Sequence, residues 1–466
     1  MLVDWTFAEL QKITNGSNSP INESIKIKGF SIDTRSLKQG DLFCALKGEH
    51  HDGHDFLLKA YENGASCFLL SDTNKNIPSL PFIKVDNVLK ALERIAKNTR
   101  KRIDARFIAI TGSVGKTGTK EMIKLALSRV GKTFANKGNF NNHIGVPLSM
   151  SNAPYDSDYC ILELGMNRKG EIKKLSNLVS PEIGIITAIE NSHLKGLKTL
   201  KNILEAKSEI LDNIRKDGCF IYNADTNYSE ELKQKAEKIN IRTIISYGKN
   251  EKSDIQLLNK KKIKDKYLIE AKYFKKKISW KMPDLSDHWY INSLCILGIG
   301  RYCGLNISSL LDSLENFKLP SGRGNLVYVE KWLKKFYIID DSYNSSPASL
   351  SASLDKFNKM KFTGNKIAVL GDMNELGENS EILHLNMKKK LEKTNINIIF
   401  TVGKYMKKLS QELPSSIRKM HFEDIYELED ELKKIVCTND CLLFKGSHST
   451  ELYSVVKKIS GVNHDL

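Results

Sequence analysis

The sequence predicts an α/β protein with several mostly parallel sheets. Its 466 residues exceed what one hydrophobic core normally organises. Short unbroken apolar runs, typical of strands buried on both faces, alternate with segments of helical periodicity along most of the chain. A hydrophobic fraction of 41% and a charged fraction of 27% are usual for globular proteins. Repeated strand–helix alternation favours parallel sheets, which bind ligands at the carboxyl ends of their strands.

The first predicted unit, residues 1–104, is a small mixed α/β unit. Short strands and glycine-bearing turns fill most of it, including the stretch "SIDTRSLKQGDLFCALKGEHHDGHDF". Residues 87–103 carry a helical pattern that leads into the next unit.

Two larger units follow, residues 105–319 and residues 320–466, and both alternate buried strands with helices. The strand candidates of the second unit are Phe107–Ile110, Tyr159–Leu162, Ile183–Thr187 and Cys219–Tyr222, and those of the third are Tyr337–Ile339, Ile367–Leu370, Ile398–Val402 and Leu442–Phe444.

The chain is strongly basic, with a formal net charge of +17. Lysines are spread along it, with one dense stretch at residues 249–281, where aromatic and aliphatic residues interleave with them. This interleaving favours antiparallel strands with one solvated face over a nucleic-acid groove, and we expect no nucleic-acid partner. The excess charge suits a polyanionic substrate without identifying one.

The stretch "FIAITGSVGKTGTKEM" (residues 107–122) ends like a Walker A phosphate loop but lacks the first glycine of that pattern. The pattern G-x-x-x-x-G-K-[ST] would place this glycine at Ile110, whereas the only earlier glycine is Gly112. An apolar strand precedes the loop, and apolar residues at helical spacing follow it. Strand, loop and helix in this order direct free backbone N–H groups at phosphate.

Within this loop, Lys116 is placed to reach the outer phosphates of a nucleotide and the Thr117 hydroxyl to ligate Mg²⁺. The alternative is that Gly-Lys-Thr merely begins a helix in an ordinary α/β unit. The neighbouring strand and helix favour the nucleotide site.

Polar residues follow several predicted strands: Glu163, His193, Asp340, Asp341 and Asp372. Each alone could be a helix cap or a buried hydrogen-bonded group. Glu163 and His193 share a predicted sheet with the phosphate loop, which favours a functional role for both. A carboxylate, the loop hydroxyl and nucleotide phosphates form a plausible Mg²⁺ shell.

Taken together, these segments resemble the Mur ligase family, the ATP-dependent amide-forming enzymes of peptidoglycan precursor synthesis. The resemblance covers nearly the whole chain. Its motifs here are "TGSVGKT", whose family form needs no earlier glycine, and "GNFNNHIGVPLSM", "LELGMNRKGEI", "EAKSEI", "DDSYNSSPASL" and "VLGDMNELGENSEILH". It implies a central P-loop-type ATPase domain with a parallel sheet, a smaller mixed α/β N-terminal domain that binds a UDP-muropeptide, and a Rossmann-like C-terminal domain.

Within the family, the chain is most similar to the branch that adds D-alanyl-D-alanine to UDP-N-acetylmuramoyl-tripeptide. The implied reaction passes through an acyl phosphate and gives UDP-N-acetylmuramoyl-pentapeptide, ADP and phosphate, with ATP and Mg²⁺ as cofactors. Two alternatives stay open. One is a related ligase that adds a single amino acid, and the other is a nucleotide-dependent binding protein on the same scaffold.

The resemblance also assigns roles to residues. Lys116, His193 and Lys207 are implied in catalysis, and Thr117, Glu163, His193 and Lys207 in metal binding. The implied nucleotide-binding residues are Thr111, Gly112, Ser113, Val114, Gly115, Lys116, Thr117, Gly118, Asn292, Arg323 and Asp341, with His288 near the adenine. The implied muropeptide-binding residues are Ser31, Arg35, Asn139, Asn141 and Asn142.

Three positions bear on how far the resemblance extends. Several family members carbamylate the lysine that corresponds to Lys207, which would turn this cation into an anion that supports a second metal. Gly118 stands where the family loop usually has threonine, so we expect lower loop rigidity. His448 stands where this branch usually has arginine, and an imidazole would be a weaker, pH-dependent substrate contact.

Composition also suggests the compartment. The eight cysteines contain no C-x-x-C pair and fit unpaired, mostly buried thiols in a reducing cytosol. No apolar run approaches the ~18 residues that a membrane helix needs. The first residues lack the layout of an export signal. We therefore expect a cytoplasmic protein without a membrane span, and a monomer by default.

Overall fold

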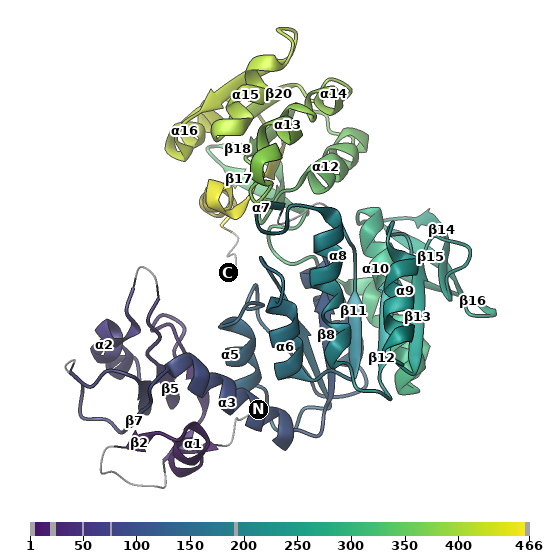
Figure 1. The fold of residues 1–466 in the computed structure, drawn as a ribbon. Helices are drawn as coiled ribbons and strands as arrows, with labels where there is room; N and C mark the ends of the chain where they lie inside the picture. Colours follow the sequence, from purple (N-terminus) through teal and green to yellow (C-terminus); the bar gives the residue numbers. More distant parts are fainter. Residues whose placement is uncertain (1–4, 19–24, 49–50, 75–76, 191–193, 462–466) are drawn as a thin grey trace.

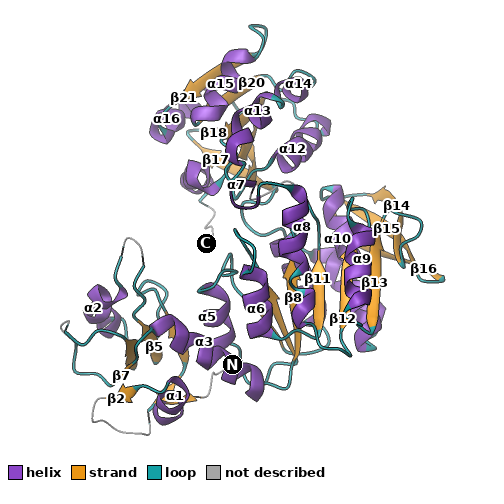
Figure 2. Cartoon of the chain, viewed as in Figure 1, coloured by secondary structure: helices purple, strands orange, loops and turns teal. Residues whose placement is uncertain are grey.

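A computed structural model describes residues 5–18, 25–48, 51–74, 77–190 and 194–461. The elements gather in three bodies, which Figure 1 colours purple, teal and green to yellow along the chain. Each body contains a sheet with helices around it, as Figure 2 shows. The C-terminal body lies beyond α7 and α8 of the central body, and α3 and α5 join the N-terminal body to the central one (Figure 1).

The N-terminal body holds a five-stranded sheet in the order β2-β7-β6-β5-β4, parallel except for β2. A two-stranded antiparallel pair, β1 and β3, lies beside it. The strands are β1 (Trp5–Thr6), β2 (Ser17–Asn18), β3 (Lys26–Ile27), β4 (Gly29–Ser31), β5 (Asp41–Cys44), β6 (Cys67–Leu70) and β7 (Phe82–Lys84). The helices are α1 (Phe7–Thr14), η1 (Gly53–Phe56), α2 (Leu57–Glu62) and α3 (Val88–Arg102).

Helix α3 connects the first two bodies. The Asn87 side chain accepts from the Lys90 N–H at 2.9 Å and caps its first turn. Ala91, Leu92 and Ile95 line its buried face, as the helical pattern of residues 87–103 predicts.

The central body is built on a nine-stranded sheet in the order β16-β15-β14-β13-β12-β11-β8-β10-β9. In this order, all neighbouring strands from β14 to β9, including β8, pair in parallel. Strand β15 pairs antiparallel with both β14 and β16. The strands are β8 (Arg106–Thr111), β9 (Thr133–Ala135), β10 (Tyr159–Glu163), β11 (Ile183–Ile186), β12 (Cys219–Asn223), β13 (Thr243–Gly248), β14 (Ile255–Ile263), β15 (Lys266–Tyr273) and β16 (Lys276–Pro283). The helices are α4 (Lys116–Leu127), α5 (Gly145–Ser151), α6 (Glu171–Val179), α7 (Leu194–Leu197), α8 (Leu200–Ser208), η2 (Leu211–Asn213), α9 (Ser229–Lys238), α10 (Asp287–Cys303), α11 (Ile307–Asp312) and η3 (Ser313–Asn316).

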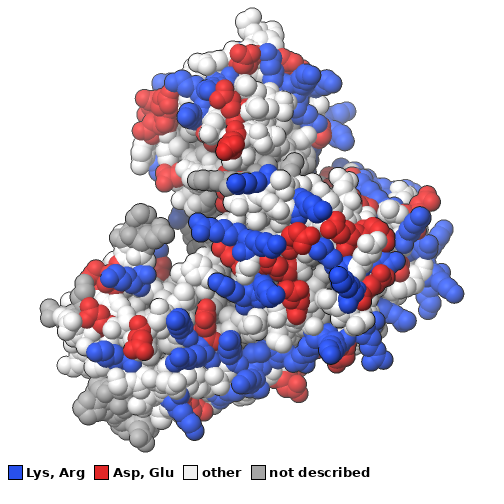
Figure 3. Space-filling model, viewed as in Figure 1, with Lys and Arg blue, Asp and Glu red and all other residues white. Residues whose placement is uncertain are grey.

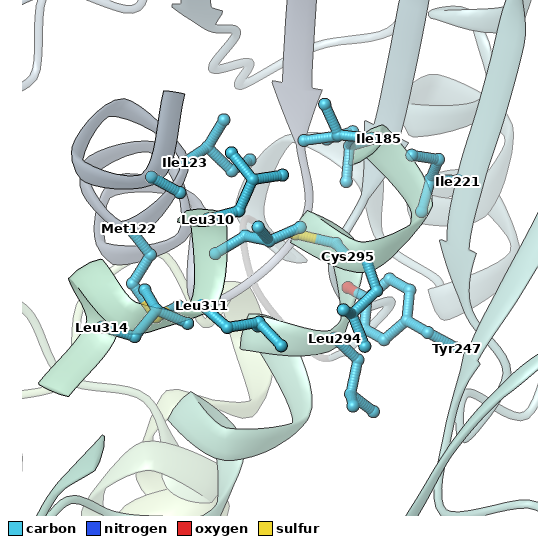
Figure 4. Packing of buried hydrophobic residues seen from close by; sticks show 14 of the residues in the cluster. Met122, Ile123, Ile185, Ile221, Tyr247, Leu294, Cys295, Leu310, Leu311 and Leu314 are labelled. Carbon is cyan, nitrogen blue, oxygen red and sulfur yellow. The ribbon is translucent and has the colours of Figure 1, made fainter. Parts of the chain in front are cut away.

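Helices cover both faces of this sheet, which explains why its strands read as continuous apolar runs. Helices α4, α10 and α11 pack on one face, where Met122, Ile185 and Leu294 meet in the cluster of Figure 4. Helices α5, α6, α8 and α9 pack on the other face, around Phe107 and Leu162.

The lysine-rich stretch forms β14, β15 and β16, so the predicted antiparallel strands are confirmed. Ile269 and Trp280 are buried on one face, while lysines fill the exposed positions. Lys262 pairs with Asp284 at 3.5 Å and Lys266 with Glu315 at 3.0 Å. Figure 3 shows basic and acidic side chains mixed over the visible face. These exposed pairs contribute little stability, and the mixed charge is that of a solvated surface.

The C-terminal body holds a six-stranded sheet in the order β17-β18-β22-β19-β20-β21, parallel except for β17. Helices α16 and α17 pack on one face, and α12, α14 and α15 on the other. The strands are β17 (Asn325–Lys331), β18 (Lys334–Asp341), β19 (Lys366–Gly371), β20 (Ile398–Val402), β21 (Arg418–Phe422) and β22 (Cys441–Lys445). The helices are α12 (Pro347–Lys359), η4 (Gly377–Asn379), α13 (Ser380–Leu385), α14 (Lys388–Leu391), α15 (Lys404–Glu412), α16 (Ile425–Ile435), η5 (His448–Thr450) and α17 (Leu452–Ser460).

The predicted α/β class with a central parallel sheet is confirmed, and each strand candidate of the two larger units falls on a strand. The eight cysteines are unpaired, and of these only Cys437 is exposed. Within the described ranges, no helix is both long and apolar enough to span a bilayer.

Replacing Leu294 by alanine tests the core between α10 and the sheet. Leu294 is fully buried, so we expect Leu294→Ala to lower the free energy of unfolding by about 2–5 kcal/mol, since a cavity adds to the lost transfer energy. Urea unfolding followed by tryptophan fluorescence measures the change. Leu258, 42% exposed in the same body, is the control, and Leu258→Ala should cost less than about 0.5 kcal/mol. Equal losses would contradict this placement of the core.

Candidate active site

The carboxyl ends of β8, β10 and β11 bring the predicted phosphate loop and its partners to one edge of the central sheet. Strand β8 lies between the other two, and Ile110 is level with both Glu163 and Ile185. The loop after β8, the Glu163 side chain and the loop after β11 therefore meet at this edge, as parallel pairing requires.

Close packing against the end of β11 explains why the loop sequence lacks the first glycine of the Walker A pattern. Ile110 is a paired strand residue, so the turn begins only at Gly112. A Cβ on Gly112 would lie 2.0 Å from the Thr187 hydroxyl. That hydroxyl donates to the Val114 carbonyl at 2.7 Å, which fastens the loop to β11. Gly112 thus allows the loop to lie close to the end of β11, so a glycine at position 110 is not needed.

The loop then turns directly into α4. Gly115 has φ +82°, and a Cβ there would lie 2.5 Å from the Asn292 amide nitrogen on α10. The Ser113 hydroxyl donates to the Glu190 carbonyl at 2.8 Å and accepts from the Glu190 N–H at 2.9 Å. Lys116, at the first turn of α4, donates to the Gly112 carbonyl at 2.8 Å. These bonds hold the loop around the start of a helix, where backbone N–H groups favour phosphate.

Glu163 is held at the end of β10 by two asparagines. Its backbone N–H donates to the Asn136 side chain at 2.9 Å, and its Oε1 accepts from the Asn141 amide at 2.7 Å. Lys120, fully buried on α4, donates to the Asn136 carbonyl at 2.5 Å and so fixes this segment. The sequence interpretation missed both Asn136 and Lys120, because neither belongs to a recognisable spacing.

Lys207 is a fully buried lysine on α8, with 1% of its surface exposed. Burial lowers the pKa of its ammonium well below the ordinary lysine value, and the charge of Lys116 lowers it further. Glu375 and Glu163 oppose this shift. A neutral amine is the form of lysine that reacts with CO₂, so the environment suits carbamylation.

Arg323 reaches the phosphate loop from the C-terminal body. Its guanidinium donates to the Thr117 hydroxyl at 2.9 Å and lies 4.1 Å from the centre of the Tyr343 ring. Buried Asp340 shapes its turn, since the Gly322 N–H donates to the Asp340 carboxylate at 3.1 Å and the Gly324 N–H to its carbonyl at 2.7 Å. Asp340 is therefore a buried, hydrogen-bonded structural residue, which is one of the two roles that its position after a strand allowed.

Asp341 faces the opposite way from Asp340 and lines the same cavity as Arg323. Lys445 pairs with it at 2.9 Å, and Ser353 donates to it. His288 also lines this cavity and keeps part of its surface exposed, and desolvation by the surrounding protein lowers the pKa of its ring to about 4.

One cavity of about 1090 Å³ connects these groups and receives residues from all three bodies. The predicted residues that line it are Ser113, Val114, Gly115, Lys116, Thr117, Asn139, Asn141, Asn142, Glu163, His288, Arg323 and Asp341. The N-terminal body contributes Leu89, Glu93 and Lys97 of α3.

Other predicted residues lie outside this lining. Thr111, Gly112, Gly118, Asn292 and Lys207 pack behind it. Ser31 is buried on β4 and Arg35 pairs with Asp33 at 2.6 Å, so the structure does not bring them to the cavity. His193 lies outside the described residues.

Gly118 packs directly against the indole of α10. A Cβ at this position would lie 1.9 Å from the Trp289 ring, and Trp289 is 4% exposed. The indole therefore fills the space that a threonine would take, and Gly118 makes the close contact possible. The lower rigidity expected of the loop stays a prediction.

Two further expectations change in the C-terminal body. Asp372 caps α15, because its carboxylate accepts from the Tyr405 N–H at 3.1 Å and the Met406 N–H at 2.8 Å. Of the two roles considered for Asp372, the structural one, a helix cap, is therefore correct. His448 is exposed and stacks on Tyr453 at 4.5 Å between ring centres, and it does not line the cavity.

The residues at the loop fit a bound Mg²⁺. Glu163 is 1% exposed, and its Oε2 has no hydrogen-bond partner among the described residues. An orphaned carboxylate oxygen beside the Thr117 hydroxyl and a phosphate-binding loop is the donor set that Mg²⁺ prefers. In the described part, no group of three or more His, Cys, Asp and Glu side chains could hold a metal, so phosphates and waters would complete the shell.

Comparison with known proteins identifies the family. The Mur ligase middle domain matches residues 110–300, the Mur ligase glutamate ligase domain residues 322–448, and the Mur ligase family catalytic domain residues 26–100. A Bacillus subtilis (strain 168) protein named UDP-N-acetylmuramoyl-tripeptide--D-alanyl-D-alanine ligase is 33% identical over 448 residues, 95% of each chain. The chain belongs to the Mur ligase family.

Other relatives agree along nearly the whole length. The Rickettsia prowazekii (strain Madrid E) protein of the same name is 32% identical and covers 94% of this chain and 96% of its own. Crystal structure I of MurF from Acinetobacter baumannii has a TM-score of 0.83 at 26% identity, covering 99% of this chain and 100% of that one. MurF ligase from Thermotoga maritima in complex with ADP has a TM-score of 0.77 at 24% identity, covering 93% and 97%, and shares the fold.

The Gly118–Trp289 contact can be tested by a double-mutant cycle. Gly118→Thr should lower the free energy of unfolding by about 1–3 kcal/mol, because the added side chain overlaps the indole. Trp289→Ala alone should cost about 3–5 kcal/mol. In the double variant the threonine occupies vacated space, so the combined loss should be smaller than the sum. Urea unfolding of the four proteins measures this, and additive losses would contradict the contact.

Proposed function

We propose that this chain is the ATP-dependent ligase that joins D-alanyl-D-alanine to UDP-N-acetylmuramoyl-tripeptide. The observation that carries the proposal is one cavity that unites the phosphate loop, Glu163 and Arg323 with residues of all three bodies. Curated relatives of this name that match nearly full length support the substrates. The product would be UDP-N-acetylmuramoyl-pentapeptide for peptidoglycan synthesis, and hence for cell shape and division. The nucleotide substrates favour a cytoplasmic site of action.

In this mechanism the tripeptide carboxylate attacks the γ-phosphorus of ATP, and the dipeptide amine then displaces phosphate from the acyl phosphate. Two polyanions must meet, so the protein has to neutralise charge and align the reactants. Lys116 and the loop N–H groups would hold the phosphates on the central body. Arg323 would add a positive charge from the C-terminal body, and it already contacts Thr117.

The nucleotide and muropeptide have separate parts of the cavity. Asn292 lies against Gly115 and, with His288 and Asp341, would surround the nucleoside. Asn139 and Asn141 lie on the Glu163 side, where the tripeptide end would enter. Ser31 and Arg35 would bind the distant uridine diphosphate end.

Bound Mg²⁺ would offset the charge of the phosphates during transfer. Thr117 and Glu163 would hold one ion, and His193 with a carbamylated Lys207 would hold a second. Support for the Lys207 role comes from its complete burial and lowered pKa, because a buried ammonium without compensation is unfavourable.

The reaction is tested by phosphate release from ATP with Mg²⁺ and UDP-muramoyl-tripeptide, with and without D-alanyl-D-alanine. We expect release that needs both substrates and a product mass equal to muropeptide plus dipeptide minus water. Single D- and L-amino acids in place of the dipeptide serve as controls. Turnover with a single amino acid, or ATP turnover that ignores both substrates, would contradict the proposal.

Carbamylation of Lys207 is tested separately with ¹³C-bicarbonate. Burial lowers the pKa of Lys207, so at a given pH more of its amine is neutral than in an exposed lysine. We expect a carbamate ¹³C signal in the wild-type protein that decreases as the pH falls and the amine protonates. The signal should be absent in Lys207→Arg but present in Lys201→Arg, an exposed control on the same helix. An identical signal in Lys207→Arg would refute the assignment.

A further inference from the structure

Glu375 is an acidic residue of the cavity that lies within the motif "VLGDMNELGENSEILH" but has no role in the chemistry proposed above. It lies between β19 and η4, in the segment Asp372–Leu376 that we call the β19–η4 loop. It lines the same cavity as Lys116 and Arg323, although it belongs to the C-terminal body. The cavity that it lines also contains the phosphate loop, so its carboxylate shares one space with the groups that would bind phosphate.

The β19–η4 loop is fixed on both sides of Glu375. Asp372 caps α15, and the Met373 N–H donates to buried His384 at 2.8 Å. The Asn374 N–H donates to the Ser447 hydroxyl at 2.8 Å.

Glu375 itself has a left-handed backbone conformation, with φ +64°. This conformation is energetically unfavourable for a non-glycine residue, so it persists only where the surrounding structure imposes it. Leu376, the next residue, is buried at 2% exposure and anchors the other side. The side chain is thus presented to the cavity by a rigid segment rather than by a free loop.

The other carboxylates that line the cavity have different positions or partners. Glu163 lies at the phosphate loop and Asp341 pairs with Lys445. Glu171 accepts from the Asn167 N–H at 2.7 Å, and burial raises the pKa of Glu190. Glu93 lies on α3, at the N-terminal side. Two of these six carboxylates, Glu375 and Asp341, come from the C-terminal body, and Asp341 is the one that pairs with Lys445.

The dipeptide substrate brings a chemical requirement that the phosphate-binding groups cannot meet. Its α-ammonium is a cation that must approach a region containing Lys116 and Arg323. Like charges repel more strongly in a protein cavity than in water, because the effective dielectric constant is lower. A fixed carboxylate at this place offsets that repulsion and orients the nitrogen, which attacks once the ammonium has given up a proton.

We propose that Glu375 binds the α-ammonium group of the incoming D-amino-acid dipeptide and positions its nitrogen beside the acyl group to be attacked. This inference rests on the ligase function proposed above. It assigns the amine end of the dipeptide to the C-terminal body and the phosphates to the central body, with the new bond forming between them.

The test compares wild type, Glu375→Gln and Glu375→Asp, with Glu378→Gln as the matched control. Glu378 is exposed, lies three residues further along the chain in η4 and does not line the cavity. In Glu375→Gln we expect kcat/KM for D-alanyl-D-alanine to fall about 10- to 100-fold, as for loss of a charged hydrogen-bond partner. The KM values for ATP and muropeptide should stay within about twofold, Glu375→Asp should recover part of the loss, and Glu378→Gln should match wild type.

Two further readouts separate amine binding from the rest of the reaction. Hydroxylamine, a small neutral nucleophile, traps the acyl phosphate as a hydroxamate without the dipeptide, and its rate should be equal in wild type and Glu375→Gln. D-lactyl-D-alanine has a hydroxyl in place of the amine, and it should inhibit wild type and Glu375→Gln equally.

Each other outcome overturns the inference. An unchanged kcat/KM for the dipeptide in Glu375→Gln would show that Glu375 does not bind its α-ammonium group. A parallel loss of hydroxamate formation or a raised KM for ATP would show that Glu375 acts on the phosphate lysines or on folding. Hydroxamate formation by wild type without any dipeptide-dependent turnover would refute this subsite and the dipeptide while leaving the activation step intact. Absence of both in wild type would refute the proposed function itself.

Discussion

The buried positive charge at the carboxyl edge of the central sheet is the constraint on which the rest of the site depends. Lys207 is fully enclosed, and the charge of Lys116 makes its protonated form still less favourable. Such a pair is stable only if anions compensate or a proton leaves. Glu163 supplies one compensating charge from the same sheet, and Glu375 supplies another from a different body. A bound polyphosphate would satisfy the same need.

The backbone was more predictable than the contacts made upon it. Each strand candidate of the two larger units, and the antiparallel lysine-rich strands, follow from apolar runs and alternation, which are local properties. Thr117, Glu163 and Arg323 could be predicted because they lie in recognisable motifs or at strand ends. Lys120 and Asn136 were missed, since their roles arise from a pairing distant in sequence, that of Lys120 with the Asn136 carbonyl. The contact of Gly118 with Trp289 could not be foreseen for the same reason, because Trp289 lies on another helix.

Strand-end carboxylates show where sequence position stops being informative. Asp340 and Asp341 are adjacent at the end of β18, and alternation along a strand sends their side chains to opposite sides. Asp340 is 1% exposed and organises the Arg323 turn, while Asp341 opens to the cavity. Asp372 directly follows β19, which lies in the same sheet beyond β22, yet it caps α15. All three fit the rule that ligands bind at these ends, but only the packing of the next helix decides which carboxylate remains available.

The contact between Arg323 and Thr117 shows why the site must be shared between bodies. A single body that carried every phosphate-binding cation would repel the ammonium of an incoming amine, and one that carried every carboxylate would repel ATP. In the proposed ligase, dividing the charges would let each body bind its own substrate. Arg323 extends positive charge across the boundary to Thr117, and Glu375 extends negative charge across it to Lys116. The two groups act in opposite senses from the same body, so the C-terminal body both completes the phosphate site and limits its positive field where the amine has to arrive.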